Sequence, residues 1–290
     1  MDREYVSRIN QAIDYIVHNL DQNLTVEEIA DHCCFSKFYF NRIFRLVTQE
    51  SIYSFIKRLK LESAAFKLRS TRQSVTEIAM ASGYSPSNFA SAFKEYFGMN
   101  ASEFRKTRRV PVKDPYLAVV DHIQSLRKQD DYFDRIDANI TIRKKATMYL
   151  EYRRFIGNYI NGLTPAWDGF RREMERKYGP NKEDGQYIGI SYDDPLIADE
   201  NHCIYDMCMA VPKITSVNTH KIEAGYYACY RFHDRLECLI NSFNEIFALW
   251  LPFSPYRLDD KRLALEVYHS EVDDQGKMLL DICIPVQEPR

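Results

Sequence analysis

Two stretches of this chain repeat one another, LTVEEIADHCCFSKFYFNRIFR at residues 24–45 and QSVTEIAMASGYSPSNFASAFK at residues 73–94. Each matched pair lies 49 residues apart, so that Phe40 of the first copy corresponds to Phe89 of the second. A repeat of this kind indicates one supersecondary unit used twice. The fold of the N-terminal third therefore depends on what one copy forms.

Each copy has the start signals of two short helices. Thr25 and Ser74 each precede a glutamate by three residues, which is the spacing of a capping box at a helix start. Ser36 and Ser85 are expected to cap the second helix, and Pro86 follows at the first helical position, where a missing N–H costs nothing. We therefore predict a helix, a tight turn and a second helix in each copy.

The turn between these helices requires a residue with positive φ. Gly83 can supply it in the second copy, whereas Cys34 stands at the same place in the first copy, so we expect a more strained turn there. Two helices across a short turn are typical of the helix-turn-helix, whose second helix can enter the DNA major groove. A plain helical hairpin is the alternative, and the duplication favours DNA.

A longer helix is predicted between the copies, over residues 51–70. About 19 residues at ~1.5 Å each span roughly 28 Å. Successive major grooves on one face of DNA are about 34 Å apart. A monomer could therefore present both copies to adjacent grooves, with some bending of the DNA.

The second helix of the first copy has two different faces. One is apolar and is expected to pack in the core: Phe40, Ile43, Phe44 and Val47. The other is polar apart from one aromatic residue: Phe38, Asn41, Arg42 and Arg45. Arginine can pair with guanine, asparagine with adenine, and an aromatic ring can contact a thymine methyl. Such side chains favour direct reading of bases.

The equivalent face of the second copy carries smaller side chains: Ser87, Ala90, Ser91 and Lys94. We therefore predict that this helix mainly positions the DNA backbone and responds to its shape. Charge agrees with a polyanion partner for the first third only, because residues 1–113 carry 17 Lys and Arg against 12 Asp and Glu while the whole chain has a net charge of −2.

Composition excludes several other classes. No apolar run approaches the ~18 residues of a membrane span, and the N-terminus lacks an apolar signal core, so we expect a soluble cytoplasmic protein with no membrane partner. The seven cysteines form no CxxC pair and are expected to be reduced thiols packed as small hydrophobic groups. Phosphate-loop and nucleophile-elbow motifs are missing, and we predict no metal, no cofactor and no catalytic residue.

The C-terminal part shows a second, weaker duplication. Strand and helix patterns follow the order β-α-β-β over residues 146–211 and again over residues 225–286. Together with the helical first third, this order predicts a multidomain protein: an all-α N-terminal domain with two helix-turn-helix motifs, and an α+β C-terminal domain built from two β-α-β-β repeats.

Both parts resemble known families. The doubled motif and the segment FKEYFGMNASEFRKTRR (93–109) resemble the AraC/XylS-type DNA-binding domain across roughly residues 5–109. IGNY (156–159), GISYDDP (189–195), WLPFS (250–254), LEVYHSE (265–271) and DICIPV (281–286) resemble the GyrI-like effector-binding domain over roughly residues 138–288. Domain boundaries are accordingly placed at 1–109 and 138–290, with a linker at 110–137.

The resemblance implies a transcriptional regulator, and we expect an activator. Its partners would be double-stranded promoter DNA, RNA polymerase and a small-molecule effector. The expected DNA contacts are Ser36, Lys37, Phe38, Asn41, Arg42 and Arg45 in the first copy, and Ser85, Ser87, Asn88, Ser91 and Lys94 in the second.

In GyrI-like domains a ligand lies between the half-repeats near an acidic residue. Strand alternation places Glu266 and Tyr268 on one face, and a carboxylate among aromatic rings suits a cationic or lipophilic ligand. Further expected pocket residues are Trp250, Tyr149, Tyr192 and Tyr227. The alternatives are a glutamate solvated at the sheet surface, and a protein that sequesters or hydrolyses drugs or toxins with Glu266 as general base.

Overall fold

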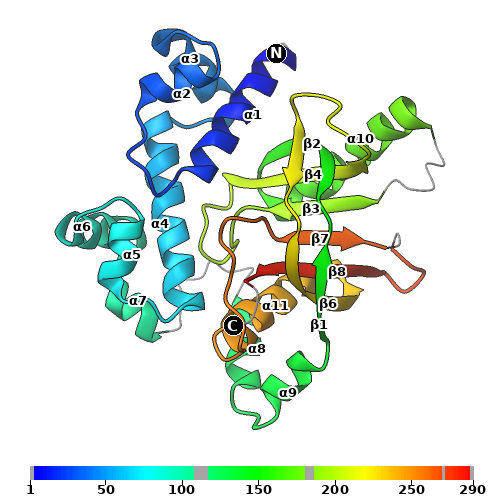
Figure 1. The fold of residues 1–290 in the computed structure, drawn as a ribbon. Coiled ribbons are helices and arrows are strands. Elements are labelled where there is room, and N and C mark those ends of the chain that lie inside the picture. The colour runs from blue at the N-terminus through cyan, green and yellow to red at the C-terminus, as the bar shows by residue number, and fades with distance from the viewer. Residues whose placement is uncertain (1–2, 108–116, 180–185, 270–271, 288–290) are drawn as a thin grey trace. The chain divides into compact units, whose positions relative to one another are not determined.

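The computed structural model describes residues 3–107, 117–179, 186–269 and 272–287. Its contacts divide the chain into two compact units, residues 1–111 with 196–198, and residues 112–195 with 199–290 (Figure 1). The expected linker is thus only partly within the described residues, because 108–116 lie outside them. We describe each unit by itself.

The first unit is helical, as predicted. Figure 1 shows the long helix α4 between the helices that precede it and those that follow. The helices are α1 (Arg3–His18), α2 (Val26–His32), α3 (Lys37–Thr48), α4 (Ile52–Ser70), α5 (Val75–Ala81), α6 (Pro86–Phe97) and α7 (Ala101–Thr107). The bounds of α2 and α5, and those of α3 and α6, are each 49 residues apart. The duplicated helix-turn-helix is therefore confirmed.

Side-chain caps explain why these helices begin where they do. The Thr25 hydroxyl accepts the Glu28 N–H at 3.2 Å, and the Glu28 carboxylate accepts the Thr25 N–H at 3.0 Å. Ser74 forms the same capping box in the second copy. Ser85 caps α6 through the Asn88 N–H, whereas the Ser36 side chain makes no cap bond to α3 although it occupies the N-cap position.

The two copies differ in the residues that adopt left-handed backbone. Cys34 has φ 56° where Gly83 has φ 75°, which confirms the expected difference at the turn. The copies differ in the same way at the end of the second helix, where Gln49 of the first copy has φ 62° and Gly98 of the second has φ 72°. The first copy therefore has a side chain at both left-handed positions, which favour glycine.

Aromatic rings fill the core of this unit. Phe44 lies 5.5 Å from Phe40 and 5.1 Å from Phe55 of α4, measured between ring centroids. In the second copy, Phe93 lies 5.3 Å from Phe89 and 5.4 Å from Phe104 of α7. The predicted apolar face of α3 was wrong at one position, because Val47 is only half-buried.

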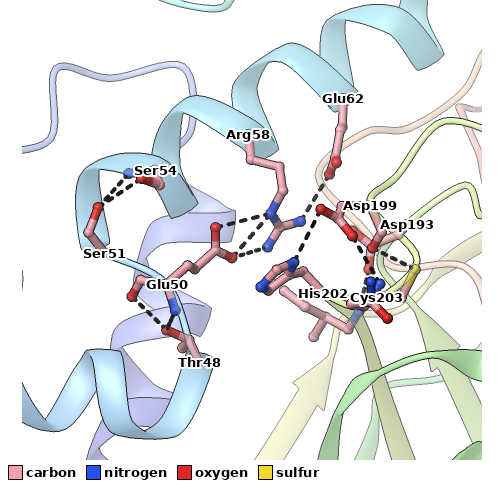
Figure 2. Close-up of polar contacts among 12 residues, drawn as sticks. Thr48, Glu50, Ser51, Ser54, Arg58, Glu62, Asp193, Asp199, His202 and Cys203 are labelled. Carbon is pink, nitrogen blue, oxygen red and sulfur yellow. Dashed lines mark hydrogen bonds and ion pairs between the residues drawn. The ribbon is translucent and has the colours of Figure 1, made fainter. Parts of the chain in front are cut away.

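An ion-pair network on α4 connects this helix to the second helix of each copy, α3 and α6. Arg58 binds Glu50 just after α3, with Nη2 at 2.7 Å from Oε1, and Glu62 one turn along α4, with Nη1 at 3.0 Å from Oε2 (Figure 2). The Tyr96 hydroxyl of α6 donates to Glu62 at 2.7 Å. The network therefore helps to set the orientation of α3 and α6 on α4.

The second unit is built on an antiparallel sheet of eight strands in the order β1-β6-β8-β7-β3-β4-β2-β5. Its strands are β1 (Ile140–Lys145), β2 (Met148–Gly157), β3 (Tyr187–Ser191), β4 (Cys203–Val211), β5 (Thr219–Ile222), β6 (Gly225–Arg235), β7 (Leu265–Tyr268) and β8 (Lys277–Val286). Its helical segments are α8 (Leu117–Leu126), α9 (Tyr132–Asp137), α10 (Tyr159–Tyr178), the 3-10 turn η2 (Leu236–Cys238), α11 (Leu239–Asn244) and the π-helix η3 (Glu245–Trp250).

The predicted β-α-β-β repeat is confirmed as β2-α10-β3-β4 and β6-α11-β7-β8. The third element of each repeat, β3 or β7, is the strand nearest the middle of the sheet. These two strands pair with one another, and Gly189 lies opposite Glu266. Strands β1 and β5 were not predicted and extend the two outer edges of the sheet. The two half-repeats therefore meet at Glu266.

Apolar side chains fill both faces of this sheet. Trp167 and Phe170 of α10 pack on Tyr205 and Met207 of β4, and η3 packs on β8. The other face buries Leu265 and Val267. Within the expected linker, Ile123 of α8 and Ile136 of α9 join the apolar cluster beneath η3, so this part is packed structure rather than a plain connector.

All seven cysteines are free thiols, as predicted, and five of them are buried: Cys33, Cys203, Cys208, Cys229 and Cys283. Among the described residues, none of the helices has the length and hydropathy to cross a membrane.

Candidate functional site

The outer face of α3 has the form that the sequence predicts. Phe38 is 93% exposed, although aromatic rings usually gain stability from burial. Asn41, Arg42 and Arg45 are exposed beside it in the helical periodicity, and the Asn41 amide donates to the Lys37 carbonyl at 3.0 Å. An unburied ring next to two guanidinium groups is a surface suited to base edges.

Lys37 at the start of α3 forms an ion pair with Glu27 of α2. Hydrogen bonding to this partner raises the pKa of Lys37 and lowers the pKa of Glu27. Both groups are exposed, so this pair contributes little to stability. Ser36 is exposed and its hydroxyl makes no cap bond to α3.

On α6 the predicted contact residues are exposed, but several are occupied within the helix. The Ser85 hydroxyl caps the Asn88 N–H at 3.3 Å, and the Ser91 hydroxyl donates to the Ser87 carbonyl at 3.2 Å. Lys94 is the exposed cation of this face. The surface therefore offers short hydroxyls and one charge.

The second candidate site surrounds Glu266, at the junction of the half-repeats. Only 4% of Glu266 is exposed, so the alternative of a solvated surface carboxylate does not hold. The Tyr205 hydroxyl donates to Glu266 Oε2 at 2.5 Å and the Tyr268 hydroxyl donates to the same oxygen at 2.8 Å. Both hydroxyls therefore bond to the same carboxylate oxygen, Oε2.

Burial governs the charge of this site. It raises the pKa of Glu266, and the hydrogen bonds from Tyr205 and Tyr268 offset only part of that effect. Burial followed by the adjacent carboxylate raises the pKa of both tyrosines well above the usual range, so their hydroxyls stay protonated donors. A cation bound near Oε1 would favour the ionised form of Glu266 over the protonated form.

Three residues that the sequence analysis did not assign to this site shape it: Tyr205, Gly189 and Trp167. A Cβ on Gly189 would lie 1.8 Å from the Tyr205 hydroxyl and 2.8 Å from Glu266 Oε2, so only glycine leaves room for these groups. Trp167 of α10 packs on Tyr268, with 5.3 Å between ring centroids. Gly189 lies in the quoted motif GISYDDP, whereas Trp167 lies outside the quoted motifs.

The structure does not bring all of the predicted pocket residues to Glu266. Trp250 packs in the apolar cluster formed by η3 and β8, and its Nε1 donates to Asp137 at 2.6 Å. Tyr192 and Tyr227 pack in the apolar cluster on the opposite face of the sheet. Tyr149 belongs to the same cluster as Trp167 and Tyr205. Aromatic character alone could not distinguish these positions.

Tyr192 instead belongs to a buried polar cluster on that opposite face. Asp206 Oδ2 accepts hydrogen bonds from Arg154 at 2.6 Å and from Tyr192 at 2.8 Å, and it lies 2.7 Å from His220 Nε2. Burial alone would raise the pKa of Asp206, but Arg154 and His220 outweigh it and lower the pKa to about 2. This cluster holds strands β2, β4 and β5 together.

A duplicated helix-turn-helix, together with a sheet domain that encloses a carboxylate between two half-repeats, defines a DNA-binding regulator with its own small-molecule-binding domain. Residues 138–287 match the GyrI-like small molecule binding domain, and residues 29–107 match a helix-turn-helix domain. The chain belongs to the GyrI-like family through its C-terminal half and to the AraC-type transcription regulators through its helical unit.

Two curated relatives cover the helical unit. The transposon Tn10 TetD protein of Escherichia coli is 33% identical over 109 residues, which are 37% of this chain and 79% of TetD. The regulatory protein SoxS of E. coli K12 is 34% identical over 98 residues, which are 33% of this chain and 92% of SoxS. The C-terminal domain of the response regulator AraT from Geobacillus stearothermophilus is 30% identical, covering 36% of this chain and 87% of that domain, with a TM-score of 0.34.

Proposed function

We propose that α3 reads base sequence and that α6 mainly positions the DNA. The single supporting observation is the contrast between their outer faces. Phe38, Arg42 and Arg45 are long exposed side chains on α3, whereas α6 presents short hydroxyls that bond within the helix. Long side chains can reach base edges, and a lone lysine neutralises a phosphate without reading sequence.

Selection of bound sequences from random DNA tests this division. Arg42→Ala should flatten discrimination between sequences, since one bidentate contact is worth about 1–3 kcal/mol against the wrong base. Lys94→Ala, the matched control, should weaken binding to all sequences alike and reduce its salt dependence. Loss of specificity in Lys94→Ala, with Arg42→Ala still selective, would contradict the proposal.

For the C-terminal domain we propose a small cationic or lipophilic effector, held beside Glu266 Oε1 and the rings of Tyr205, Tyr268 and Trp167. The enclosed carboxylate supports it, because a buried acid without a cationic partner is costly and a bound cation removes that cost. Aromatic rings add cation–π attraction. Since Glu266 is almost fully buried, the effector must displace side chains that cover it.

Titration with a panel of cationic dyes and their neutral analogues tests this site. Glu266→Gln keeps the size and the hydrogen bonds of the side chain but removes the charge, so dye affinity should fall about tenfold or more. Affinity for the native protein should also fall as pH drops through the raised pKa of Glu266, because the cation then competes with a proton. Tyr227→Phe, on the opposite face, should bind dye normally.

We propose further that the protein is a cytoplasmic activator that contacts RNA polymerase, and that the domain boundary lies between residues 109 and 138. In vitro transcription from a selected promoter, with and without the protein, measures the sign of regulation. A decrease in transcript would identify a repressor instead.

Hydrolysis of an electrophile is the second candidate function, since the raised pKa of Glu266 suits a general base. We favour binding without turnover, because the raised pKa values of Tyr205 and Tyr268 make them poor proton donors to a leaving group. Turnover of an electrophilic substrate by the native protein, lost in Glu266→Gln, would establish the enzyme.

A further inference from the structure

A cavity lies in the C-terminal domain beside strand β6, and Glu266 is not among the residues that line it. It has a volume of about 570 Å³ and is lined by α8, α11 and β6, with His122, Asn139, Tyr230, Asn241 and Glu245 among its walls. A smaller cavity of about 220 Å³ shares Asn139, Tyr230 and Glu245. His122 lies outside the residues that match the GyrI-like family, so the family pattern does not include this wall.

One buried acceptor in this wall lacks a partner. Asn241 Oδ1 is inaccessible to solvent and receives no hydrogen bond from the described residues. A buried polar atom without a partner is destabilising, and in a native structure it indicates a missing ligand or water. Glu245 follows four residues later, and both residues line the cavity.

The backbone changes its geometry at this point. Helix α11 ends at Asn244, and the π-helix η3 begins at Glu245. Its wider turn is seen in the hydrogen bond from the Leu251 N–H to the Ile246 carbonyl, five residues back, at 2.8 Å. Such turns cost stability and occur frequently at functional sites.

The charged side chains of the cavity wall favour a ligand that donates hydrogen bonds over one that accepts them. His122 Nε2 lies 2.6 Å from Glu245 Oε1. Arg231 Nε lies 2.6 Å from Asp281 Oδ1, and His233 Nε2 lies 3.7 Å from Asp273. These basic side chains already face acids, so the hydrogen-bond acceptors on the cavity wall are the carboxylates of Asp234 and of Glu245, which His122 already contacts, and the amide of Asn241.

The ring of Tyr230 completes the wall. Tyr230 is half-buried, and burial followed by the nearby charge of Glu245 raises the pKa of its hydroxyl. The ring therefore offers an uncharged aromatic surface next to the carboxylate. A flat cation can stack on such a surface while its N–H groups reach the acceptors.

We propose that this cavity is a second ligand site, for a small planar cation with N–H donors such as an aryl amidinium or guanidinium. One N–H would bind the Glu245 carboxylate, and another would reach Asn241 Oδ1 once the side chains that cover this oxygen move aside, with the ring of the ligand against Tyr230. The site is separate from Glu266, and the proposal does not depend on the function proposed for that residue.

Benzamidinium is the probe, and neutral benzamide of the same shape is its control, both titrated calorimetrically into the full-length protein. We expect Glu245→Gln and Asn241→Leu each to weaken benzamidinium binding about tenfold, since the first removes the charge that pairs with the amidinium and the second removes one hydrogen-bond acceptor. Glu266→Gln should bind the probe within about twofold of the native protein, because Glu266 does not line this cavity. Circular dichroism establishes whether each variant is folded. If Glu245→Gln does not fold, the result for Asn241→Leu decides the outcome.

Three results would overturn the proposal. Benzamide could bind as tightly as benzamidinium, which would mean that charge is not recognised. The native protein could fail to bind the probe at millimolar concentration. Binding could also be lost in Glu266→Gln and kept in Glu245→Gln, which would place the cation at the junction of the half-repeats while leaving the effector proposal intact.

Discussion

At the scale of single residues, the two helix-turn-helix copies show how one backbone tolerates different side chains. Cys34 and Gln49 adopt the left-handed conformation that glycine adopts at the matching positions of the second copy. Such a conformation costs a side-chain-bearing residue roughly 1–2 kcal/mol. The first copy therefore stores strain on both sides of the helix that we propose reads bases.

Replacing Cys34 with glycine should relieve part of this strain. We expect the free energy of unfolding to rise by up to about 1 kcal/mol, because the relief exceeds the entropy that glycine adds to the unfolded chain. Gly83→Ala is the matched control and should destabilise by about 1 kcal/mol or more. Urea denaturation measures both, and a less stable Cys34→Gly would show that Cys34 makes compensating contacts.

Phe38 is the residue whose exposure has no structural reason of its own. Because 93% of it faces solvent, Phe38→Ala should leave the melting temperature nearly unchanged. DNA affinity should nevertheless fall by about 1–3 kcal/mol if the ring contacts a base. Gel-shift titration and thermal unfolding together test this, and a large loss of stability would mean that the ring is buried in solution.

At the scale of elements, the polar cluster of Asp206 joins strands that are distant in the sequence. Arg154 on β2 and Asp206 on β4 are register partners, and His220 on β5 reaches the same carboxylate. A buried charge is tolerated only with such partners. This edge of the sheet therefore depends on a complete set of contacts rather than on apolar packing alone.

Removal of Arg154 should leave the buried carboxylate uncompensated. We expect Arg154→Met to lower the free energy of unfolding by about 3–5 kcal/mol. The double variant Arg154→Met with Asp206→Asn should recover a substantial part, because the unpaired charge is then gone. If the double variant were as unstable as the single one, packing of the Arg154 stem would be the cause instead.

The depressed pKa of Asp206 also predicts a pH dependence. The unfolded carboxyl titrates near 3.8 and the folded one near 2, so the folded state gains stability above pH 3.8 that it loses as pH falls towards 2. The stability difference between the native protein and Asp206→Asn should shrink by about 1 kcal/mol between pH 5 and pH 3. Urea denaturation at both values measures it, and a constant difference would contradict the assigned cause.

At the scale of the whole molecule, regulation requires that the two units influence one another. If a dye bound near Glu266 changes affinity for promoter DNA by some factor, then DNA must change affinity for the dye by the same factor. We expect a factor of about 5 or more in the native protein and none in Glu266→Gln. Fluorescence titrations in both orders measure it, and a factor of one would mean that the domain binds without regulating.

The prediction of the fold succeeded where the signal was local. Caps at Thr25, Ser74 and Ser85, the 49-residue repeat and strand alternation each depend on neighbours in the chain, and each appears in the structure. The packing of the segment after residue 116 was harder to predict, because the sequences of α8 and α9 show no clear apolar stripe. Their burial of Ile123 and Ile136 depends on a cluster formed by distant strands.

The sequence by itself determined the duplicated reading unit, the repeated β-α-β-β order and the face on which Glu266 and Tyr268 lie, because helical and strand periodicities are properties of a few consecutive residues. Only the tertiary structure decided which aromatic residues surround Glu266. Pairing of β3 with β7 brings Gly189 and Tyr205 to the carboxylate, whereas Tyr192 and Tyr227 pack on the opposite face of the sheet and Trp250 packs with η3. Such contacts depend on strand order, which residues far apart in the chain establish together.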